Sequence, residues 1–251
     1  MSMKVAVVAQ GKGGVGKTAD AAHIAFHAAE ESLKTLVVDL DTGNLSKTMR
    51  QHRLEMPASS LFLDELPVVP VAAGRIALLH ADRLLANVIY MPLSRTLKNF
   101  RVNLKVFEAA GYDFCVIDTP ASIGIATITA LRTADAVISP VEMEDYSIEG
   151  IKDMMRVILG ARQHNEKLQF LGIVPNRVDR RNPRQVKHLA DVQAAHGKLL
   201  APVVVGLRTS VAEALAAGEP VWKNKKTAAR AAGAEMRALG AHVLQTMGVA
   251  R

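Results

Sequence analysis

An eight-residue segment near the start of this 251-residue chain constrains its fold more than any other feature. Residues 11–18 have the sequence GKGGVGKT, which matches the phosphate-loop pattern G-x-x-x-x-G-K-[ST] at every fixed position. Glycines allow consecutive backbone N–H groups to turn toward one anion, and the N-terminus of a following helix adds partial positive charge. An apolar run at 4–9 precedes the loop and a helical pattern at 18–31 follows it. The segment therefore predicts a phosphate-binding loop between a strand and a helix.

The loop also assigns chemical roles to its side chains. Lys17 is expected to reach the β- and γ-phosphates of a nucleotide, and the Thr18 hydroxyl is expected to coordinate Mg²⁺. The residues expected to contact the nucleotide along this segment are Gly11, Lys12, Gly13, Gly14, Val15, Gly16, Lys17, Thr18 and Ala19. A nucleoside triphosphate with magnesium is the ligand that this arrangement predicts.

Short apolar runs alternate with helical patterns along the whole chain. The expected strands cover residues 4–9, 35–39, 75–80, 112–118, 136–140, 169–175 and 202–205, and the expected helices cover 18–31, 96–110, 123–133, 147–162, 183–196 and 226–245. The strand runs are nearly continuous, as expected for parallel strands that are covered on both faces. The pattern predicts one α/β domain over residues 1–251, with a doubly wound, mostly parallel sheet and helices on both faces. Residues 53–73, which contain three prolines, are expected to form loops and short helices at one edge.

Composition excludes several other classes of protein. The chain is 49% hydrophobic and 22% charged, which excludes a disordered or collagen-like chain. Its one cysteine, Cys115, excludes an internal disulfide framework and a four-cysteine metal site within one chain. No apolar run approaches the roughly 18 residues of a membrane span, and the first residues lack the apolar core of a secretory signal. We therefore expect a cytoplasmic protein.

The net charge of +7 is unevenly distributed along the chain. Residues 1–169 carry 18 Lys and Arg against 19 Asp and Glu, whereas residues 170–251 carry 13 against 5. Such an asymmetry suggests a polyanionic partner, either nucleic acid or an acidic membrane surface. A basic surface that is solvated and has no partner is the alternative on charge alone.

Three further segments join the loop in a resemblance to the ParA/MinD family of deviant Walker A ATPases. A second lysine, Lys12, stands at the start of KGGVGKT, as in the family's signature. Residues 37–41 (VVDLD) resemble its second motif, residues 114–120 (FCVIDTP) resemble its Walker B strand, and residues 174–179 (VPNRVD) resemble its adenine-recognition segment. The resemblance covers nearly the whole chain and implies a P-loop NTPase fold. It also implies weak, Mg²⁺-dependent ATP hydrolysis that a partner protein stimulates.

The resemblance further implies roles for individual residues. Lys12 would reach across an ATP-sandwiched homodimer to the other protomer's nucleotide, and Asp41 would orient or deprotonate the attacking water. Asp118 would hold the Mg²⁺ shell with support from Asp39, and Asn176 would contact adenine. The catalytic residues expected are therefore Lys12, Lys17 and Asp41, and the metal-site residues are Thr18, Asp118 and Asp39. Alternatives remain for Asp39, as a strand-end carboxylate that bonds locally, and for Asn176, as a loop residue in an Asx turn.

The chain departs from the family's pattern at two places. Residues 41–44 read DTGN, whereas the family usually has Asp-Pro-Gln-Gly-Asn, so the loop that positions water differs and hydrolysis is expected to be slow or altered. Ala19 stands where a second threonine is common, which removes one hydroxyl near the α-phosphate.

The basic residues of the last third predict contact with DNA phosphates. The first candidate group is Lys223, Lys225, Lys226 and Arg230, and the second is Arg180, Arg181 and Arg184. Aromatic residues are sparse there, with Trp222 nearly alone, so base stacking on single strands is not expected. Contact with the backbone of duplex DNA, without reading of bases, fits this composition. The first strand begins at Lys4, so we do not expect the N-terminal helix-turn-helix domain that larger plasmid ParA proteins have.

The sequence therefore favours a ParA-type partition ATPase, similar to the small Soj-like proteins. Such a protein dimerises with ATP, binds nucleoid DNA non-specifically and moves a plasmid, chromosome region or other cargo with a ParB-like adaptor. The alternative is a MinD-like membrane-associated ATPase, which needs a basic amphipathic C-terminal helix; residues 241–251 have one basic end and no aromatic. A redox role like that of the nitrogenase iron protein is not expected, because it needs two cysteines per subunit and this chain has one.

Two weaker signals are assigned ordinary structural roles. His23 and His27 lie four residues apart on one helix face, but no glutamate follows His23, so metal binding is not expected. Glu142, Glu144 and Asp145 form an acidic cluster after a strand and are expected to lie in a solvated loop.

Overall fold

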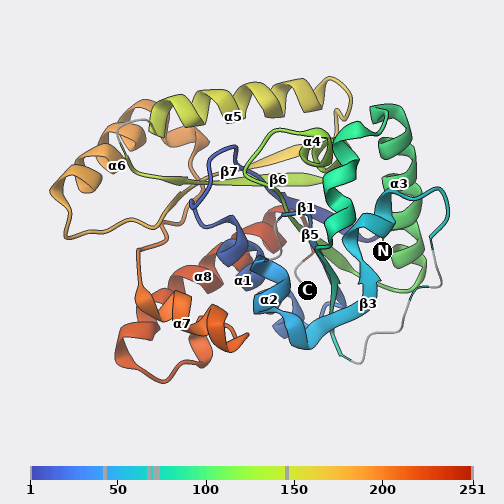
Figure 1. Ribbon diagram of the computed structural model, residues 1–251. Helices are drawn as coiled ribbons and strands as arrows, with labels where there is room; N and C mark the ends of the chain where they lie inside the picture. The colour runs from blue at the N-terminus through green and yellow to red at the C-terminus, as the bar shows by residue number, and fades with distance from the viewer. Residues whose placement is uncertain (1, 42–43, 67–68, 70–73, 145–146, 250–251) are drawn as a thin grey trace.

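The computed structural model describes residues 2–41, 44–66, 69, 74–144 and 147–249. Its strands are β1 (Lys4–Val8), β2 (Thr35–Asp39), β3 (Arg53–Pro57), β4 (Ile76–His80), β5 (Phe114–Asp118), β6 (Ala136–Glu142) and β7 (Gln169–Asn176). Its α-helices are α1 (Lys17–Glu30), α2 (Asn44–Thr48), α3 (Leu93–Ala109), α4 (Ile125–Thr133), α5 (Ser147–Arg162), α6 (Pro183–His196), α7 (Thr209–Ala217) and α8 (Thr227–Thr246). The strands form one parallel sheet in the order β3-β4-β2-β5-β1-β6-β7 (Figure 1). The predicted α/β fold with a parallel sheet is confirmed.

The central strand β1 shows why the apolar runs are continuous. Ala6 and Val8 lie in a core that α1 and α8 complete, whereas Val5 and Val7 lie in a second core with α3, α4 and α5. Figure 1 shows these two groups of helices on opposite faces of the sheet. Because both faces are covered, every residue of β2 and β5 is buried as well.

Helices α1 and α8 approach each other closely on one face. A Cβ added at Gly240 of α8 would lie 2.6 Å from the Cδ2 atom of His27 on α1. A side chain at position 240 would therefore separate the two helices, and glycine allows the contact. This packing fixes the helix that follows the phosphate loop against the basic C-terminal third of the chain.

The structure differs from the sequence-based assignments in several elements. Residues 202–205 do not form a strand: the Ala201 and Val205 N–H groups donate to β7 carbonyls at 2.8 and 2.9 Å, but Pro202 has no N–H, and only isolated bridges result. Strand β3 was not predicted because its alternate residues are exposed and Pro57 ends it, as is common in an edge strand. Helices α2 and α7 and the 3₁₀ helix η3 (Arg83–Tyr90) were also not predicted.

The sheet places the predicted site at its carboxyl edge. Strand β1 lies between β5 and β6, and the chain leaves it through α1 to reach β2, on the far side of β5. This is the point at which the direction of winding reverses, where ligands of open α/β sheets bind. Asp39 and Asp118 are paired in the register of β2 and β5, so their carboxylates end adjacent strands.

Candidate nucleotide site and basic surface

The phosphate loop joins β1 to α1 with two residues in left-handed backbone conformations. Gly14 has φ 80° and Gly16 has φ 101°, values that L side chains rarely adopt. Gly16 is also crowded, because a Cβ there would lie 2.6 Å from the Nδ2 atom of Asn176. Residues 11–14 of the loop are exposed, and the Gly11 N–H donates to the Gln10 side chain at 2.7 Å.

Lys17 begins α1, and its side chain folds back into the loop. It is 5% exposed, and its ammonium donates a hydrogen bond of 3.3 Å to the carbonyl oxygen of Lys12. Burial lowers the pKa of Lys17, while Asp118 and Asp41 act in the opposite direction. A cation held inside a glycine-rich loop at a helix N-terminus is arranged to bind phosphate.

Thr18 and Asp118 form an oxygen-rich pair beside this lysine. The Thr18 hydroxyl donates to Asp118 Oδ2 at 2.7 Å, and Asp118 is fully buried at the end of β5. Burial raises the pKa of Asp118 to about 8, and the neighbouring Asp39 and Asp41 add to the rise. Its Oδ1 atom is buried and has no hydrogen-bond partner among the described residues. A hydroxyl beside a carboxylate with one oxygen to spare fits the oxygen ligands that Mg²⁺ prefers.

Asp39 is held by local hydrogen bonds. Its Oδ1 accepts from the Asp41 N–H at 3.1 Å, and its Oδ2 accepts from the N–H and hydroxyl of Ser46 at 2.8 and 2.6 Å. The Ser46 hydroxyl in turn accepts from the Ala81 N–H at 2.8 Å. The local-bonding alternative thus describes Asp39 in this structure, where it closes the connection between β2 and α2. Its support of a metal shell stays a prediction, and the altered residues 42–43 lie outside the described residues.

Lys12 makes an ion pair that the sequence analysis missed. Its ammonium lies 2.6 Å from Glu144 and 3.9 Å from Glu142, and Arg177 lies 2.6 Å from the other oxygen of Glu142. The acidic cluster is therefore paired with cations and is not merely solvated; Asp145 lies outside the described residues. The Lys12 and Glu144 side chains are about half exposed, and such surface pairs contribute at most about 1 kcal/mol. Lys12 can exchange this partner at little cost.

Asn176 lies at the predicted edge of the sheet, but its amide is buried. Its Nδ2 group donates to Asp20 Oδ2 at 2.8 Å, its Oδ1 accepts from the Arg177 N–H at 2.8 Å, and the residue is 2% exposed. The structure therefore brings Asn176 beside Gly16 of the phosphate loop. Asp20 was not predicted as a site residue, although a carboxylate in the first turn of α1, directly after the phosphate loop, was the available signal.

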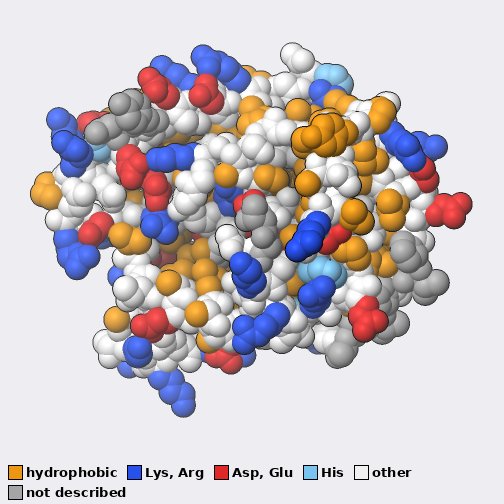
Figure 2. Space-filling model, in the orientation of Figure 1, with side chains coloured by type: hydrophobic (Ala, Val, Ile, Leu, Met, Phe, Trp, Pro, Cys, Tyr) orange, Lys and Arg blue, Asp and Glu red, His pale blue; other side chains and the backbone are white. Residues whose placement is uncertain are grey.

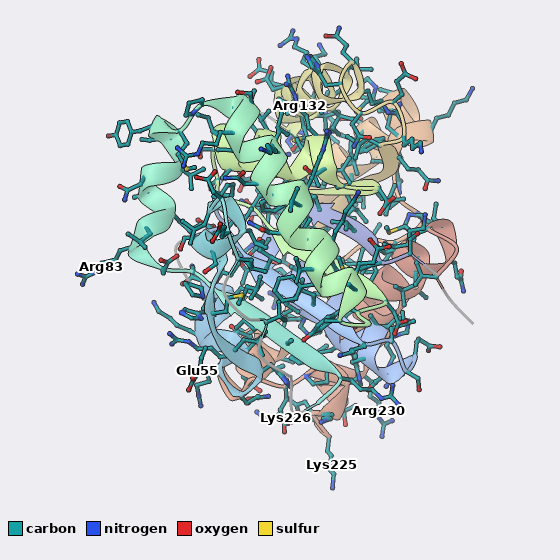
Figure 3. The ribbon with its side chains drawn as sticks, turned by 90° about the vertical axis from the view of Figure 1, so that its right-hand side faces the viewer. Glu55, Arg83, Arg132, Lys225, Lys226 and Arg230 are labelled. Carbon is teal, nitrogen blue, oxygen red and sulfur yellow. The ribbon has the colours of Figure 1, made fainter. Side chains whose placement is uncertain are left out.

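Two residues of the second basic group line a cavity that α8, the helix of Arg230, also borders. Lys225, Lys226 and Arg230 project from one end of the molecule (Figure 3). Ala228, which lies between them in sequence, lines a cavity of about 390 Å³ together with Arg180 and Arg181. In Figure 2 the surface between α6 and α7 is hollowed, with Lys and Arg side chains on both sides of the hollow. Some of the charge is neutralised, because Lys226 pairs with Glu213 at 2.9 Å and Arg181 pairs with Asp179 at 3.0 Å.

His23 is a core residue that joins the two regions. It is fully buried, its Nδ1 lies 2.7 Å from the Ala19 carbonyl oxygen, and its Nε2 lies 3.1 Å from the Val221 nitrogen. Nδ1 therefore donates and Nε2 accepts, which requires the neutral ring. Burial lowers the pKa of His23 to about 4, consistent with that state. Val221 begins the 3₁₀ helix η5 (Val221–Lys223), which leads into the basic residues.

The last helix uses its apolar side chains inside the molecule. Leu239, Val243 and Leu244 of α8 are at most 1% exposed and lie in the core that contains α1. No helix formed by the described residues is both long and apolar enough to cross a bilayer.

Comparisons with known proteins agree with this geometry. A family model described as an AAA domain matches residues 3–170. Protein IncC of Escherichia coli is 44% identical over 261 residues, covering 100% of this chain and 71% of that protein. The chromosome partitioning protein ParA of Caulobacter vibrioides is 30% identical over 230 residues, covering 87% of this chain and 86% of that protein. A cobyrinic acid a,c-diamide synthase from Mycobacterium smegmatis, solved with ADP and magnesium, superimposes with a TM-score of 0.77 at 25% identity, covering 99% of this chain and 97% of that one.

Proposed function

The chain belongs to the ParA/MinD family of partition ATPases, and we propose that it binds Mg²⁺-ATP in its phosphate loop, dimerises around the nucleotide and binds duplex DNA without sequence preference. The pairing of Thr18 with the buried Asp118 beside Lys17 carries the nucleotide part of this proposal. A ParB-like adaptor would stimulate hydrolysis and release, so the protein would act in the cytoplasm on nucleoid DNA.

Each residue of the site has a task in this proposal. Lys17 would neutralise charge on the β- and γ-phosphates, and Thr18 and Asp118 would hold Mg²⁺, which supplies further neutralisation during phosphoryl transfer. Asp41 would orient the attacking water. Lys12 would leave Glu144 and add its charge to the nucleotide of the other protomer, where negative charge develops in the transition state.

DNA contact is supported by the surface around Lys223, Lys225, Lys226 and Arg230. All four side chains are exposed, and only the ion pair of Lys226 neutralises one of them among the described residues. Because one protomer offers few phosphate contacts, its binding would be weak. A dimer doubles those contacts, which would make DNA binding depend on ATP.

Sizing chromatography with Mg²⁺-ATP tests the dimer. The Asp41→Ala variant should be dimeric with ATP because turnover is blocked, whereas Lys17→Ala and Lys12→Ala should remain monomeric. A Glu144→Gln variant is the matched control for Lys12→Ala, since it removes the same ion pair but keeps the lysine; it should still dimerise. An Asp41→Ala protein that stays monomeric at saturating ATP contradicts the sandwich arrangement.

A further inference from the structure

Asp20 is a buried carboxylate to which the proposed reaction gives no task. It lies in the first turn of α1, two residues after Thr18, and is 1% exposed. Its Oδ2 accepts the hydrogen bond from Asn176, and its buried Oδ1 has no partner among the described residues. A buried carboxylate is costly unless it is well paired, and the helix N-terminus offsets only part of that cost. The cost of burying Asp20 suggests that this carboxylate has a function.

The Asn176 side chain, which donates to Asp20, is also held by the Arg177 N–H and by its packing against Gly16. The Arg177 N–H donates to the side-chain oxygen Oδ1 of Asn176, which assigns the amide nitrogen to the side that faces Asp20. That nitrogen also packs over Gly16, where no Cβ could be accommodated. The Asn176 side chain thus links the end of β7 to both the phosphate loop and α1.

We propose that Asp20 is a positioning residue that sets the place of the nucleoside part of the ligand relative to its phosphates. The proposal rests on the proposed function in taking a nucleotide as the ligand. Lys17 and Thr18 are on the same helical turn as Asp20, and the residues after Asn176 line the cavity that extends from Val178 to Arg181. Asn176 itself lies against Gly16 of the loop, so a nucleotide with its phosphates in the loop and its nucleoside toward this cavity would pass both sides of the Asp20–Asn176 link.

The link makes a specific prediction about two ligands. Inorganic tripolyphosphate needs only the phosphate loop. ATP also needs the residues after Asn176 to be held at the right distance and angle from the loop. Loss of the Asp20 acceptor should therefore weaken ATP binding and leave tripolyphosphate binding nearly unchanged. A purely structural role would reduce both affinities together.

Calorimetric titration of the full chain with Mg²⁺ and either ATP or tripolyphosphate tests this split. Asp20→Ala should weaken ATP binding by about tenfold, the equivalent of one lost buried hydrogen bond, and tripolyphosphate binding by less than about twofold. Asp20→Asn keeps an acceptor of the same shape and should recover most of the lost ATP affinity. The matched control is Asn165→Ala, which removes two amide hydrogen bonds, to Leu131 and Ala134, at the opposite edge of the sheet and should change neither affinity.

Asn176→Ala keeps the proposal testable if Asp20→Ala does not fold. It should show the same split, and the double variant should be no weaker than either single variant because both residues act through one contact. Equal losses for ATP and tripolyphosphate, or an Asp20→Asn variant as weak as Asp20→Ala, would overturn the proposal. Failure of the unaltered chain to bind either compound would instead contradict the proposed function, and this proposal with it.

Discussion

The phosphate loop and the basic surface are built in opposite ways. Around the loop, Lys17, Asp118 and Asn176 are buried: Lys17 bonds within the loop, to the Lys12 carbonyl, whereas Asp118 and Asn176 each bond to a residue of another segment. On the basic surface, Lys225 and Arg230 are exposed, and neither makes an ion pair with a described residue. Buried polar groups must satisfy one another, so a site of the first kind needs particular residues at particular spacings. A surface that contacts phosphates needs only charge, so the sequence marks it by composition alone.

Lys17→Ala should have the largest effect and should separate the two regions. The variant would lose the charged hydrogen bond to phosphate that we propose for Lys17, so Mg²⁺-ATP binding should weaken by at least about 100-fold. Lys225→Ala removes an equal charge from the exposed surface and should leave ATP affinity unchanged. Equilibrium titration of both variants checks the contrast, and similar ATP affinities for the two would break it.

His23, which bonds to α1 and to the segment before the basic residues, should make the free energy of unfolding depend on pH. The pKa of its ring is lowered to about 4 in the folded chain, so between pH 6.5 and 4 the unfolded chain binds a proton that the folded chain does not. Stability is therefore lost as pH falls through this window, by about 2–3 kcal/mol at about pH 4.5. Urea unfolding at about pH 7 and about pH 4.5 measures the loss, and His23→Gln should show a smaller one. An equal loss in His23→Gln would assign the pH dependence to other groups.

The buried Asp118 should lower the stability of the folded chain at neutral pH when no metal is bound. Its pKa of about 8 means that the folded chain retains a proton that the unfolded chain has released between about pH 4 and pH 8, so this group destabilises the fold as pH rises through that window. Asp118→Asn removes the effect and keeps an acceptor for Thr18. The variant should be more stable by about 1–3 kcal/mol at pH 7.5 without metal, and should lose Mg²⁺-dependent turnover. Chemical denaturation with a chelator, compared at pH 5, checks the sign; a destabilised variant at pH 7.5 would contradict it.

Glu213 offers the smallest and sharpest test of the basic surface. Its carboxylate pairs with Lys226 at 2.9 Å and neutralises part of that charge. Glu213→Gln should therefore raise DNA affinity by about two- to threefold at fixed salt. Lys226→Ala should cost less affinity than Lys225→Ala, whose lysine is not offset in this way. Fluorescence anisotropy with one labelled duplex compares the three variants, and equal losses for the two lysines would show that the pairing has no influence.

The fold and the phosphate loop were largely predictable because each depends on local patterns. The apolar runs of β1, β2 and β5 follow from burial on both faces, and the loop motif specifies its own geometry. Partners distant in sequence were not predictable. Asn176 and Asp20 are 156 residues apart, and Lys12 and Glu144 are 132 apart. The motifs assign Lys12 and Asn176 to the nucleotide, and nothing in the sequence shows that Glu144 and Asp20 are their partners within the chain.

DNA binding as a function of salt, with and without ATP, tests the proposed function most directly. Each neutralised phosphate contributes about −0.9 to the slope of log K against log salt, so an ATP dimer should show a slope about twice that of the nucleotide-free chain. Binding should need ATP, should be similar on unrelated duplexes, and should fall on all of them when Lys226 and Arg230 are both replaced by alanine, while ATP-dependent dimerisation is retained. Equal binding with and without nucleotide, or a strong preference for one sequence, would contradict the proposed function.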